Sequence, residues 1–280
     1  MIKIGDYNIL KVVRKAEIGI FLDGGTRSSS DDILVPNNNL ITKDIEIGDN
    51  LEVFMYRDTF DRIIASEKKP KAIVGEVAYL EIKEIKESLG AFADIGLERD
   101  VLVPHKEQGY DLEVGKSYLL YMYVDKTGRL AATTNVDRYL ENMEDPLMHE
   151  EVTGVVYGFQ TNGSLCVAID NQYRAAVLTR EFFTAFKAGD TITGIINRVY
   201  EDGMVTLRLR AKKLDEKGKL EGQILDYLKA NNGEMKLWDK SSPEDIKDVF
   251  QCSKKYFKMA LGGLFKDKLI TIDENGTKLV

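Results

Sequence analysis

The sequence is poor in the residues of redox and metal chemistry. Its 280 residues include only two cysteines, Cys166 and Cys252, and two histidines, His105 and His149. The cysteines fall in separate predicted domains and lack the paired spacing of zinc ligands, so we expect thiols in a reducing compartment. No glycine-rich phosphate loop, nucleophile motif or repeated acidic metal cluster is present. We therefore expect a protein without enzymatic activity and without a cofactor or metal.

Long apolar runs and an excess of basic charge are also missing. The longest apolar run, "YLLYMYV", is far shorter than the roughly 20 residues of a membrane-spanning helix. The first residues, "MIKIGDYNIL", carry charges and a glycine where a secretory leader needs an apolar segment. The net charge of −7 argues against a general nucleic-acid coat, because phosphate contacts need clustered Lys and Arg, but it permits local basic surfaces. These features predict a cytoplasmic protein that does not contact membranes.

What the sequence does contain is an internal repeat. The segment "IEIGDNLEVFMYRDTFDRIIAS" matches "LEVGKSYLLYMYVDKTGRLAAT" without a gap, which pairs Asp58 with Asp125 and Arg62 with Arg129 at one constant offset. Upstream, the segment "DILVP" matches "DVLVP", and a third, weaker copy begins near Thr161. A repeat of roughly 70 residues exceeds the 20–50 residues of solenoid units, so it indicates repeated domains.

Each copy is predicted to form a small β-barrel. Its apolar residues alternate with a period of two, and Gly, Asp and Asn separate the runs, as in strands and turns. Five short strands with a glycine-led turn before the fourth favour a Greek-key barrel of the OB kind. In this scheme "D-[IV]-L-V-P" is the third strand, ended by Pro36 or Pro104, because proline cannot donate to the ladder. We expect three such domains, at residues 1–67, 70–136 and 150–212.

Near residue 210 the periodicity changes from that of strands to that of helices. A charged, linker-like stretch, "AKKLDEKGK", precedes a helix whose apolar stripe consists of Leu220, Ile224, Tyr227 and Leu228. Gly233 is expected to end this helix. The short strand "MKLW" follows it, and Trp238 at its end is expected to lie in the core.

Two further helices and a hairpin complete the C-terminal region. Ser242 is placed to cap the second helix, and Ser253 to cap the third. The core face of the third helix is predicted to consist of Phe257, Leu261, Leu264 and Phe265. The segment "KLITIDENGTKLV" predicts a hairpin that turns at Asn275-Gly276. This order of elements is typical of a winged helix, at residues 220–280.

The third of these helices carries a candidate binding surface. Lys254, Lys255 and Lys258 fall opposite the apolar stripe, and a winged helix commonly presents this helix to nucleic acid. Gly262 and Gly263 inside the helix cost about 1 kcal/mol each relative to Ala. Either close helix packing or the close approach of a partner is expected to compensate for that cost.

The pattern "GAFADIG", then "LVP", "VGK" and "DKTGRL", resembles the S1-type OB domain, an RNA-binding module. Three such copies followed by a winged helix resemble the bacterial conserved virulence factor B family of RNA-binding regulators, over nearly the whole chain. The resemblance implies a mainly β fold with an α+β tail, and single-stranded RNA as the partner. It also implies that the second-strand aromatic, Phe21 or Phe92, shares a binding face with Arg62 or Arg129.

The sequence departs from the S1 pattern in ways that shift the expected site. The inserted loop "GTRSSSDD" makes Phe21 a weaker platform candidate than Phe92. The third copy has Leu165 in place of the aromatic, yet its end is cationic. The candidates there are Tyr173, Arg174, Arg198, Arg208, Arg210, Lys212 and Lys213. RNA is therefore expected chiefly at the third copy and the tail.

Other interpretations stay open at the level of sequence. An aromatic on a barrel strand often belongs to the core, and pairs such as Asp58–Arg62 and Asp125–Arg129 are often surface ion pairs worth at most about 1 kcal/mol. The lysines of the third helix can equally form a solvated face. The chain as a whole could be a winged-helix DNA-binding regulator, or an adaptor that binds other proteins through its acidic first two barrels. No dimerisation seam is evident, so a monomer is expected.

Overall fold

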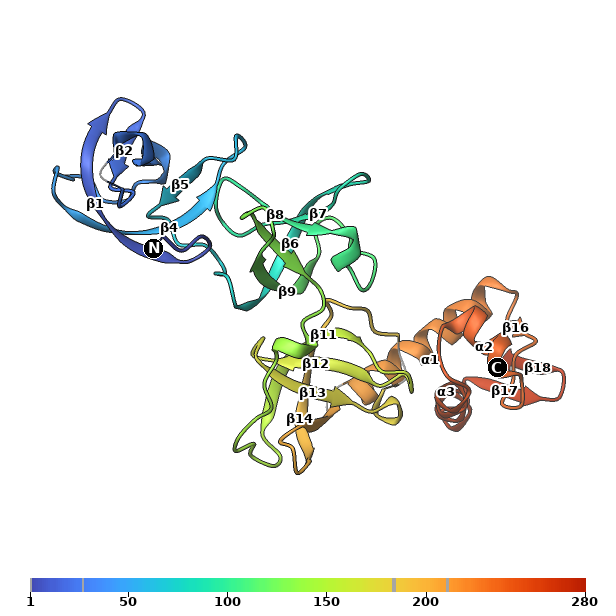
Figure 1. Cartoon of the computed structure of the whole chain (residues 1–280). Coiled ribbons are helices and arrows are strands. Elements are labelled where there is room, and N and C mark those ends of the chain that lie inside the picture. The colour runs from blue at the N-terminus through green and yellow to red at the C-terminus, as the bar shows by residue number, and fades with distance from the viewer. Residues whose placement is uncertain (1, 27, 183–184, 210–211) are drawn as a thin grey trace. The chain divides into compact units, whose positions relative to one another are not determined.

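The computed structural model describes residues 2–26, 28–182, 185–209 and 212–280, and the side chains of 212–217 are not described. It divides into two compact units, Met1–Glu141 and Asn142–Val280, which are treated separately below. The chain forms three closed five-stranded β-barrels followed by a winged-helix region, so the predicted fold class is confirmed (Figure 1). Within the described ranges, no helix is both long and apolar enough to cross a membrane.

The first barrel closes in the strand order β1-β2-β3-β5-β4. Its strands are β1 (Tyr7–Ala16), β2 (Gly19–Leu22), β3 (Ile33–Pro36), β4 (Asn50–Arg57) and β5 (Ile63–Ser66), with short 3-10 turns at Ser29–Asp31 and Asn37–Asn39. Alternate side chains point inward because successive residues of a strand face opposite sides. Val12, Leu22, Val35, Val53 and Met55 are all fully buried in this core. The predicted third strand is confirmed, and Pro36 is its last residue.

The second barrel repeats this topology. Its strands are β6 (Val77–Lys86), β7 (Gly90–Ala93), β8 (Val101–Pro104), β9 (Ser117–Val124) and β10 (Leu130–Thr133). A 3-10 turn at His105–Glu107 follows β8, and another at Asp137–Tyr139 follows β10. Gly90 opens β7 with φ +136°, and a Cβ there would lie 2.2 Å from the carbonyl oxygen of Val103. Only glycine fits this close approach of β7 to β8.

The two barrels of the first unit share an apolar seam. Phe54 and Tyr56 on β4 point away from the core of their own barrel, yet they are 0% and 1% exposed. They cluster with Ile64 and pack against residues of the following segment and barrel: Ile73, Leu97 and Leu130. Because the outer face of the first barrel is buried in this way, the two barrels are expected to be coupled in stability.

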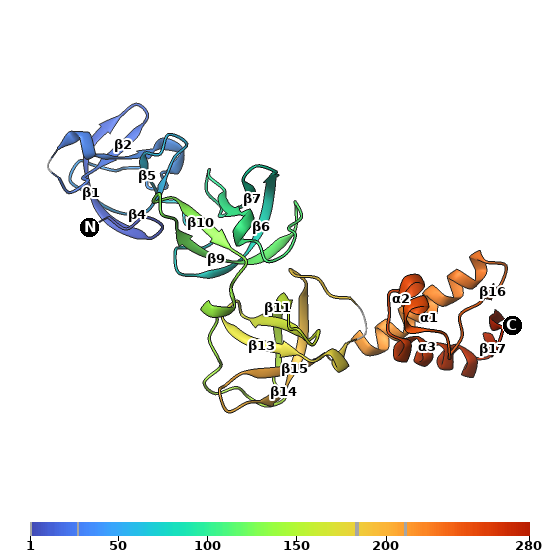
Figure 2. The same cartoon turned by 45° about the vertical axis from the view of Figure 1, so that its right-hand side comes forward.

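The third barrel closes in the equivalent order, β11-β12-β13-β15-β14. Its strands are β11 (Glu151–Phe159), β12 (Leu165–Ile169), β13 (Tyr173–Val177), β14 (Thr191–Val199) and β15 (Val205–Leu209), with a 3-10 turn at Thr179–Glu181 (Figure 2). Leu165 is fully buried in the barrel core. The sequence assignment of Leu165 to the outward aromatic position was therefore wrong by one residue, and Cys166 holds that position.

The segment before β11 is packed against this barrel rather than extended as a linker. The Asn142 side-chain amide donates to the Asp202 carbonyl at 2.6 Å, and Met143 packs against the core. The His149 amide donates to the Ile196 carbonyl at 2.9 Å. These contacts belong to the second unit, which begins at Asn142.

A fragment of residues 142–280 should therefore be more stable than one of residues 150–280. Both should fold, because the third barrel closes within residues 151–209. The shorter fragment loses the Met143 packing and the Asn142 hydrogen bond, each of which contributes on the order of 1 kcal/mol. Thermal melts of the two fragments measure the difference. Equal melting temperatures would show that the segment 142–149 contributes nothing to the barrel.

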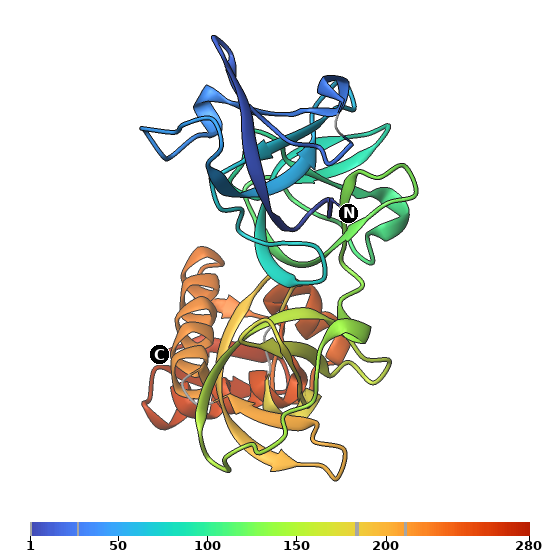
Figure 3. The ribbon, with the colours of Figure 1, turned by 60° about the vertical axis from the view of Figure 1, so that its left-hand side comes forward.

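The C-terminal region has the predicted winged-helix order with adjusted boundaries. Its elements are α1 (Lys212–Ala230), β16 (Glu234–Met235), α2 (Pro243–Phe250), α3 (Lys254–Lys266), β17 (Ile270–Asp273) and β18 (Gly276–Leu279). Most of the stretch expected to be a linker is the beginning of α1, the long helix of this region (Figure 3). Its lysines and glutamate are good helix formers, so charge alone does not mark a linker. The strand expected at "MKLW" is limited to Glu234–Met235.

Side chains in the winged helix confirm the predicted caps and most of the core. The Ser242 hydroxyl accepts from the Asp245 amide at 3.1 Å, and the Ser253 hydroxyl from the Tyr256 amide at 3.3 Å. Leu220, Ile224, Leu228, Phe257, Leu261 and Leu264 are buried together. Phe265, predicted in this core, is instead 55% exposed, because it is the residue after Leu264 and falls off the buried stripe.

The hairpin turns one residue earlier than predicted. Asp273 pairs with Gly276, so the two-residue loop is Glu274-Asn275 and Gly276 is the first residue of β18. A Cβ on Gly276 would lie 2.1 Å from the carbonyl oxygen of Met235. The glycine is thus required by the close approach of β16, and its φ of +138° after the loop also favours glycine.

Gly262 is exposed on α3, and a Cβ built there would meet no atom within 4 Å. Close helix packing, one of the two explanations offered for this glycine, is therefore excluded. We expect Gly262→Ala to stabilise the winged helix by about 1 kcal/mol, because alanine restricts the unfolded chain and favours the helix. Gly222→Ala on α1, which also has open space around it, is the matched control in thermal melts. If Gly262→Ala alone weakens ligand binding, a partner backbone approaches at this point.

Candidate nucleic-acid interface

Three predicted arginines of the third barrel share one outward face. Ala176 on β13 pairs with Thr206 on β15, and Thr206 pairs with Arg198 on β14. Residues two apart on a strand point to the same side, so Arg174 lies beside Ala176 and Arg208 lies beside Thr206. Arg198 and Arg208 are exposed and Arg174 is half-buried. We call these three side chains the arginine face.

The aromatic residues near the arginine face are not the ones that the sequence predicted. Cys166 pairs with Ala176 and with Gly158, so small residues occupy the platform row. Tyr173, predicted as a contact, is half-buried and packs against the barrel core, and its role in binding stays a prediction. The sequence missed Tyr200, whose ring lies 4.8 Å from the guanidinium carbon of Arg198.

Three other predicted residues follow β15 in the sequence. Arg210 lies outside the described residues. Lys212 and Lys213 begin α1, and their side chains are not described. Their contribution to the surface therefore stays a prediction.

In the first barrel, Phe21 stands in an outward row across four strands. Strand pairing aligns Arg14 with Phe21, Phe21 with Leu34, and Leu34 with Ile64. Phe21 is half-buried and is not part of the barrel core. The Arg14 guanidinium lies 3.6 Å from the ring centroid, a cation–π contact that fixes the ring. Sequence reasoning missed Arg14, although alternation along β1 marks it as outward-facing.

A cavity of about 490 Å³ lies beside the Phe21 ring. Phe21, Leu34, Ile64 and Arg62 line it, together with Gly24 and three residues of the inserted loop: Ser30, Asp31 and Asp32. The structure thus brings Phe21 and Arg62 together, as the resemblance implied. The loop expected to weaken this site forms one of its walls instead.

The equivalent row of the second barrel is less favourable to an anion. Here Glu84 pairs with Phe92, and Phe92 pairs with Leu102. Phe92 is half-buried, with the Lys86 ammonium 5.0 Å from its ring centroid. That ammonium is also 3.2 Å from the Glu84 carboxylate. Glu84 therefore occupies the position that Arg14 has in the first barrel, and its carboxylate compensates the charge of Lys86.

Asp58 has a structural role in the turn before β5. Its carboxylate accepts hydrogen bonds from the Phe60 and Arg62 amides and forms an ion pair with the Arg62 guanidinium at 2.6 Å. Partial burial alone would raise the pKa of Asp58, but these hydrogen bonds lower it below its ordinary value. The predicted Asp58–Arg62 pair is confirmed, and Arg62 remains 66% exposed.

Arg129 does not use the predicted partner for its side chain. From Arg129, Asp125 accepts the backbone amide, while the Arg129 guanidinium donates to Asp61 of the first barrel at 2.9 Å. This bond raises the pKa of Arg129. Arg57 completes the bridge between the barrels by donating to the carbonyls of Gly128 and Asp61. The prediction paired Arg129 wrongly because the contact joins two repeats, which spacing within one repeat cannot reveal.

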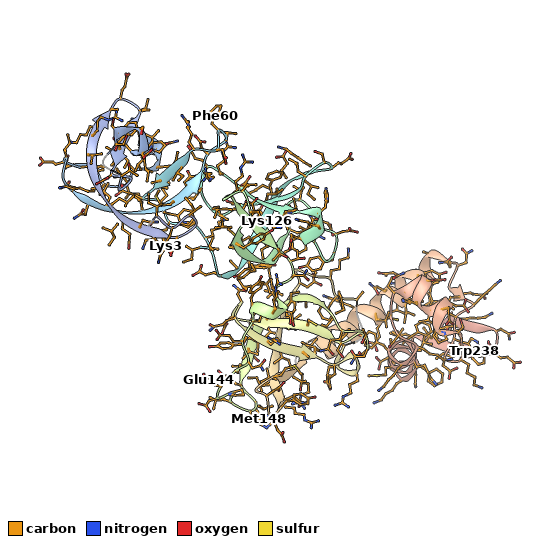
Figure 4. The ribbon with its side chains drawn as sticks, viewed as in Figure 1. Lys3, Phe60, Lys126, Glu144, Met148 and Trp238 are labelled. Atoms are coloured by element: carbon orange, nitrogen blue, oxygen red, sulfur yellow. The ribbon has the colours of Figure 1, made fainter. Side chains whose placement is uncertain are left out.

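The lysines of α3 lie beside a turn that contains Trp238. The Lys254 ammonium donates to the Lys240 carbonyl at 3.1 Å, and the Lys258 ammonium is 3.7 Å from the Asp239 carboxylate. Lys255 is exposed. Trp238 is half-buried and outside the winged-helix core, so its predicted core placement was wrong. Figure 4 labels it at the periphery of this domain.

The domain types agree with models of known families. The S1 domain matches residues 4–68 and 74–135, and the CvfB-like winged helix domain matches residues 222–279. Conserved virulence factor B of Staphylococcus aureus (strain N315) is 27% identical over 242 residues, covering 82% of this chain and 79% of that protein. Uncharacterized protein YitL of Bacillus subtilis (strain 168) is 32% identical over 281 residues, covering 97% of this chain and 92% of that protein. The chain belongs to the conserved virulence factor B family.

A solved structure shares the fold of this conserved virulence factor B family member. It is a multidomain protein with nucleic acid binding domains from Streptococcus pneumoniae, with a TM-score of 0.55 and 22% identity, covering 99% of this chain and 98% of that one. Neither family model covers the third barrel, which is assigned by its strand order. The matched domains are of nucleic-acid-binding kinds and not of enzyme kinds. Among the described residues, no group of His, Cys, Asp and Glu is arranged to hold a metal ion.

Proposed function

We propose that this chain is a non-enzymatic regulatory protein that holds single-stranded RNA, chiefly through the arginine face and the winged helix. The observation that carries the proposal is the alignment of Arg174, Arg198 and Arg208 on adjacent strands of one outward barrel face. Cations spaced along neighbouring strands suit a flexible phosphate backbone, and Tyr200 adds an aromatic ring for a base. Small residues between the arginines leave room for the strand to lie close to the sheet.

The distribution of charge supports placing RNA on the second unit. Residues 1–141 contain 25 acidic and 19 basic side chains, whereas residues 142–280 contain 21 and 20. Almost all of the net negative charge therefore lies in the first two barrels, which would repel a phosphate chain over most of their surface. In this proposal the protein acts as a monomer, and its first unit adds a single aromatic contact at Phe21.

Titration of labelled RNA at several salt concentrations tests this proposal. The double variant Arg198→Gln/Arg208→Gln should bind more weakly, and its slope of log affinity against log salt should fall by about 1.4, or 0.7 per lost phosphate contact. Because both side chains are exposed, the melting temperature should hardly change. The control is Arg180→Gln/Lys187→Gln, which removes two exposed cations elsewhere on the same barrel.

Single-stranded DNA and duplex DNA are titrated in parallel. Preference for single-stranded RNA supports the proposal. Tighter binding of the duplex by every variant would point to a DNA-binding regulator instead. Binding of no nucleic acid at all would leave the protein adaptor as the better interpretation.

A further inference from the structure

The only tryptophan of the chain lies half-buried on a turn and outside the winged-helix core. The turn joins β16 to α2 and consists of residues 238–241. The Trp238 amide donates to the Ser241 hydroxyl at 2.9 Å, and the Ser241 amide donates to the Trp238 carbonyl at 3.1 Å. These reciprocal bonds fix the backbone on which the indole is mounted.

Both ends of this turn are anchored in the winged helix. On one side the buried Thr277 hydroxyl donates to the Leu237 carbonyl at 2.8 Å, which ties the turn to β18. On the other side Ser242 caps α2 directly. Because these bonds already order the turn, it should lose little conformational entropy when a ligand binds to Trp238.

Lysines lie on the Trp238 turn and beside it. The Lys240 ammonium lies 5.3 Å from the Trp238 ring centroid. Lys254 and Lys258 on α3 reach the same turn through the Lys240 carbonyl and the Asp239 carboxylate. Lys255, the next residue of α3, is exposed but borders a different pocket with Lys247 and Gln251. Only Asp239 opposes this group of positive charges within the turn.

We propose that Trp238 is a base-stacking platform for single-stranded RNA, with Lys240 and Lys258 holding the flanking phosphates. A purely structural tryptophan would be buried, whereas this ring is half-buried, and it has a cation on its face that can swing out to a phosphate. Stacking of a base on an aromatic ring beside cations is how single strands are held. Lys254 has a different role, because its ammonium is used to position the turn. The site rests on the proposed RNA-binding function and adds a contact of its own to it.

Intrinsic fluorescence of the full chain tests the site directly, because Trp238 is the single tryptophan. A uridine-rich single-stranded RNA, long enough to span several bases, should quench its emission as it binds. Fluorescence anisotropy of the same labelled RNA reports binding anywhere on the chain. RNA that binds by anisotropy without changing the Trp238 emission would overturn the stacking site and leave the proposed function intact. No binding in either measurement would reject both.

Substitutions of Trp238 distinguish a role in base stacking from a role in folding. Trp238→Ala should weaken binding by roughly 5- to 100-fold, whereas Trp238→Phe should retain most of the affinity. Phe265→Ala removes another exposed aromatic of the same domain and should bind like the parent chain. Equal affinity of all three variants would overturn the proposal. If Trp238→Ala fails to fold, Trp238→Phe and the fluorescence titration still decide.

Asp239→Asn provides a gain-of-binding test. Removal of the carboxylate frees the Lys258 ammonium, now 3.7 Å away, and removes repulsion of a phosphate. Affinity should rise several-fold, and the salt slope should steepen by about 0.7 for one added contact. Asp226→Asn, an exposed acid on α1, is the control. If only a protein partner and no RNA shifts the Trp238 emission, the turn is a protein-docking site and the proposal is wrong.

Discussion

Phe54→Ala should lower the free energy of unfolding of the first unit by about 3–5 kcal/mol, the usual effect of removing a fully buried aromatic. Phe54 is 0% exposed although it points out of its own barrel. It forms a buried cluster with Tyr56 and Ile64, and Ile73, Leu97 and Leu130 pack against this cluster across the seam. The loss should therefore destabilise both barrels of the unit.

Hydrogen exchange followed by mass spectrometry on the full chain can measure the two barrels separately. Peptides from residues 7–66 and 77–133 should lose protection together. Tyr121→Ala is the matched control, because Tyr121 is at the same repeat position but is only half-buried, so its loss should cost less. If exchange changes only in peptides of the first barrel, the seam does not couple the two.

The repeat explains why so much of the fold could be predicted from the sequence. Matched segments such as "DILVP" and "DVLVP" mark equivalent strands, and the third strand ends at Pro36 and Pro104 as predicted. Local chemistry also placed the caps of α2 and α3 at Ser242 and Ser253. These features depend on residues close together in the sequence, where propensity and capping act directly.

The errors arise where distant segments meet or where apolar residues do not alternate with polar ones. The run "SLCVAI" is apolar on both faces, so its register could not be read, and Leu165 was assigned outward where Cys166 lies. Arg129 pairs with Asp61 of another repeat, which no local spacing indicates. Trp238 was assigned to the core from its residue type alone, while it lies half-buried on a turn outside that core.

The inserted loop of the first barrel lies beside a predicted platform residue. The loop between β2 and β3 departs from the pattern of the second barrel, and that departure made Phe21 the weaker candidate. In the structure the loop contributes Gly24, Ser30 and Asp32 to the wall of the cavity beside Phe21. An insertion next to a binding face can therefore add a wall to a site as readily as obstruct it.

Phe21→Ala should weaken binding of single-stranded RNA by about 1–3 kcal/mol while leaving the fold intact. The ring is half-buried outside the barrel core, faces Arg14, and borders a cavity with Arg62 on its wall. A base stacked on it would gain both the aromatic surface and a nearby cation. Phe92→Ala should have a smaller effect, because Glu84 stands opposite Phe92 and pairs with Lys86.

Binding curves and thermal melts of both variants separate a platform from a core residue. A core role for Phe21 would appear as a loss of about 3–5 kcal/mol in stability with unchanged RNA affinity of the folded protein. A platform role predicts the reverse, a normal melt with weakened binding. Arg14→Gln should then reproduce part of the Phe21→Ala effect, since the guanidinium holds the ring at 3.6 Å. A well-folded Phe21→Ala protein that binds RNA with unchanged affinity would confine the RNA to the second unit, and the first two barrels would serve as a rigid structural pair.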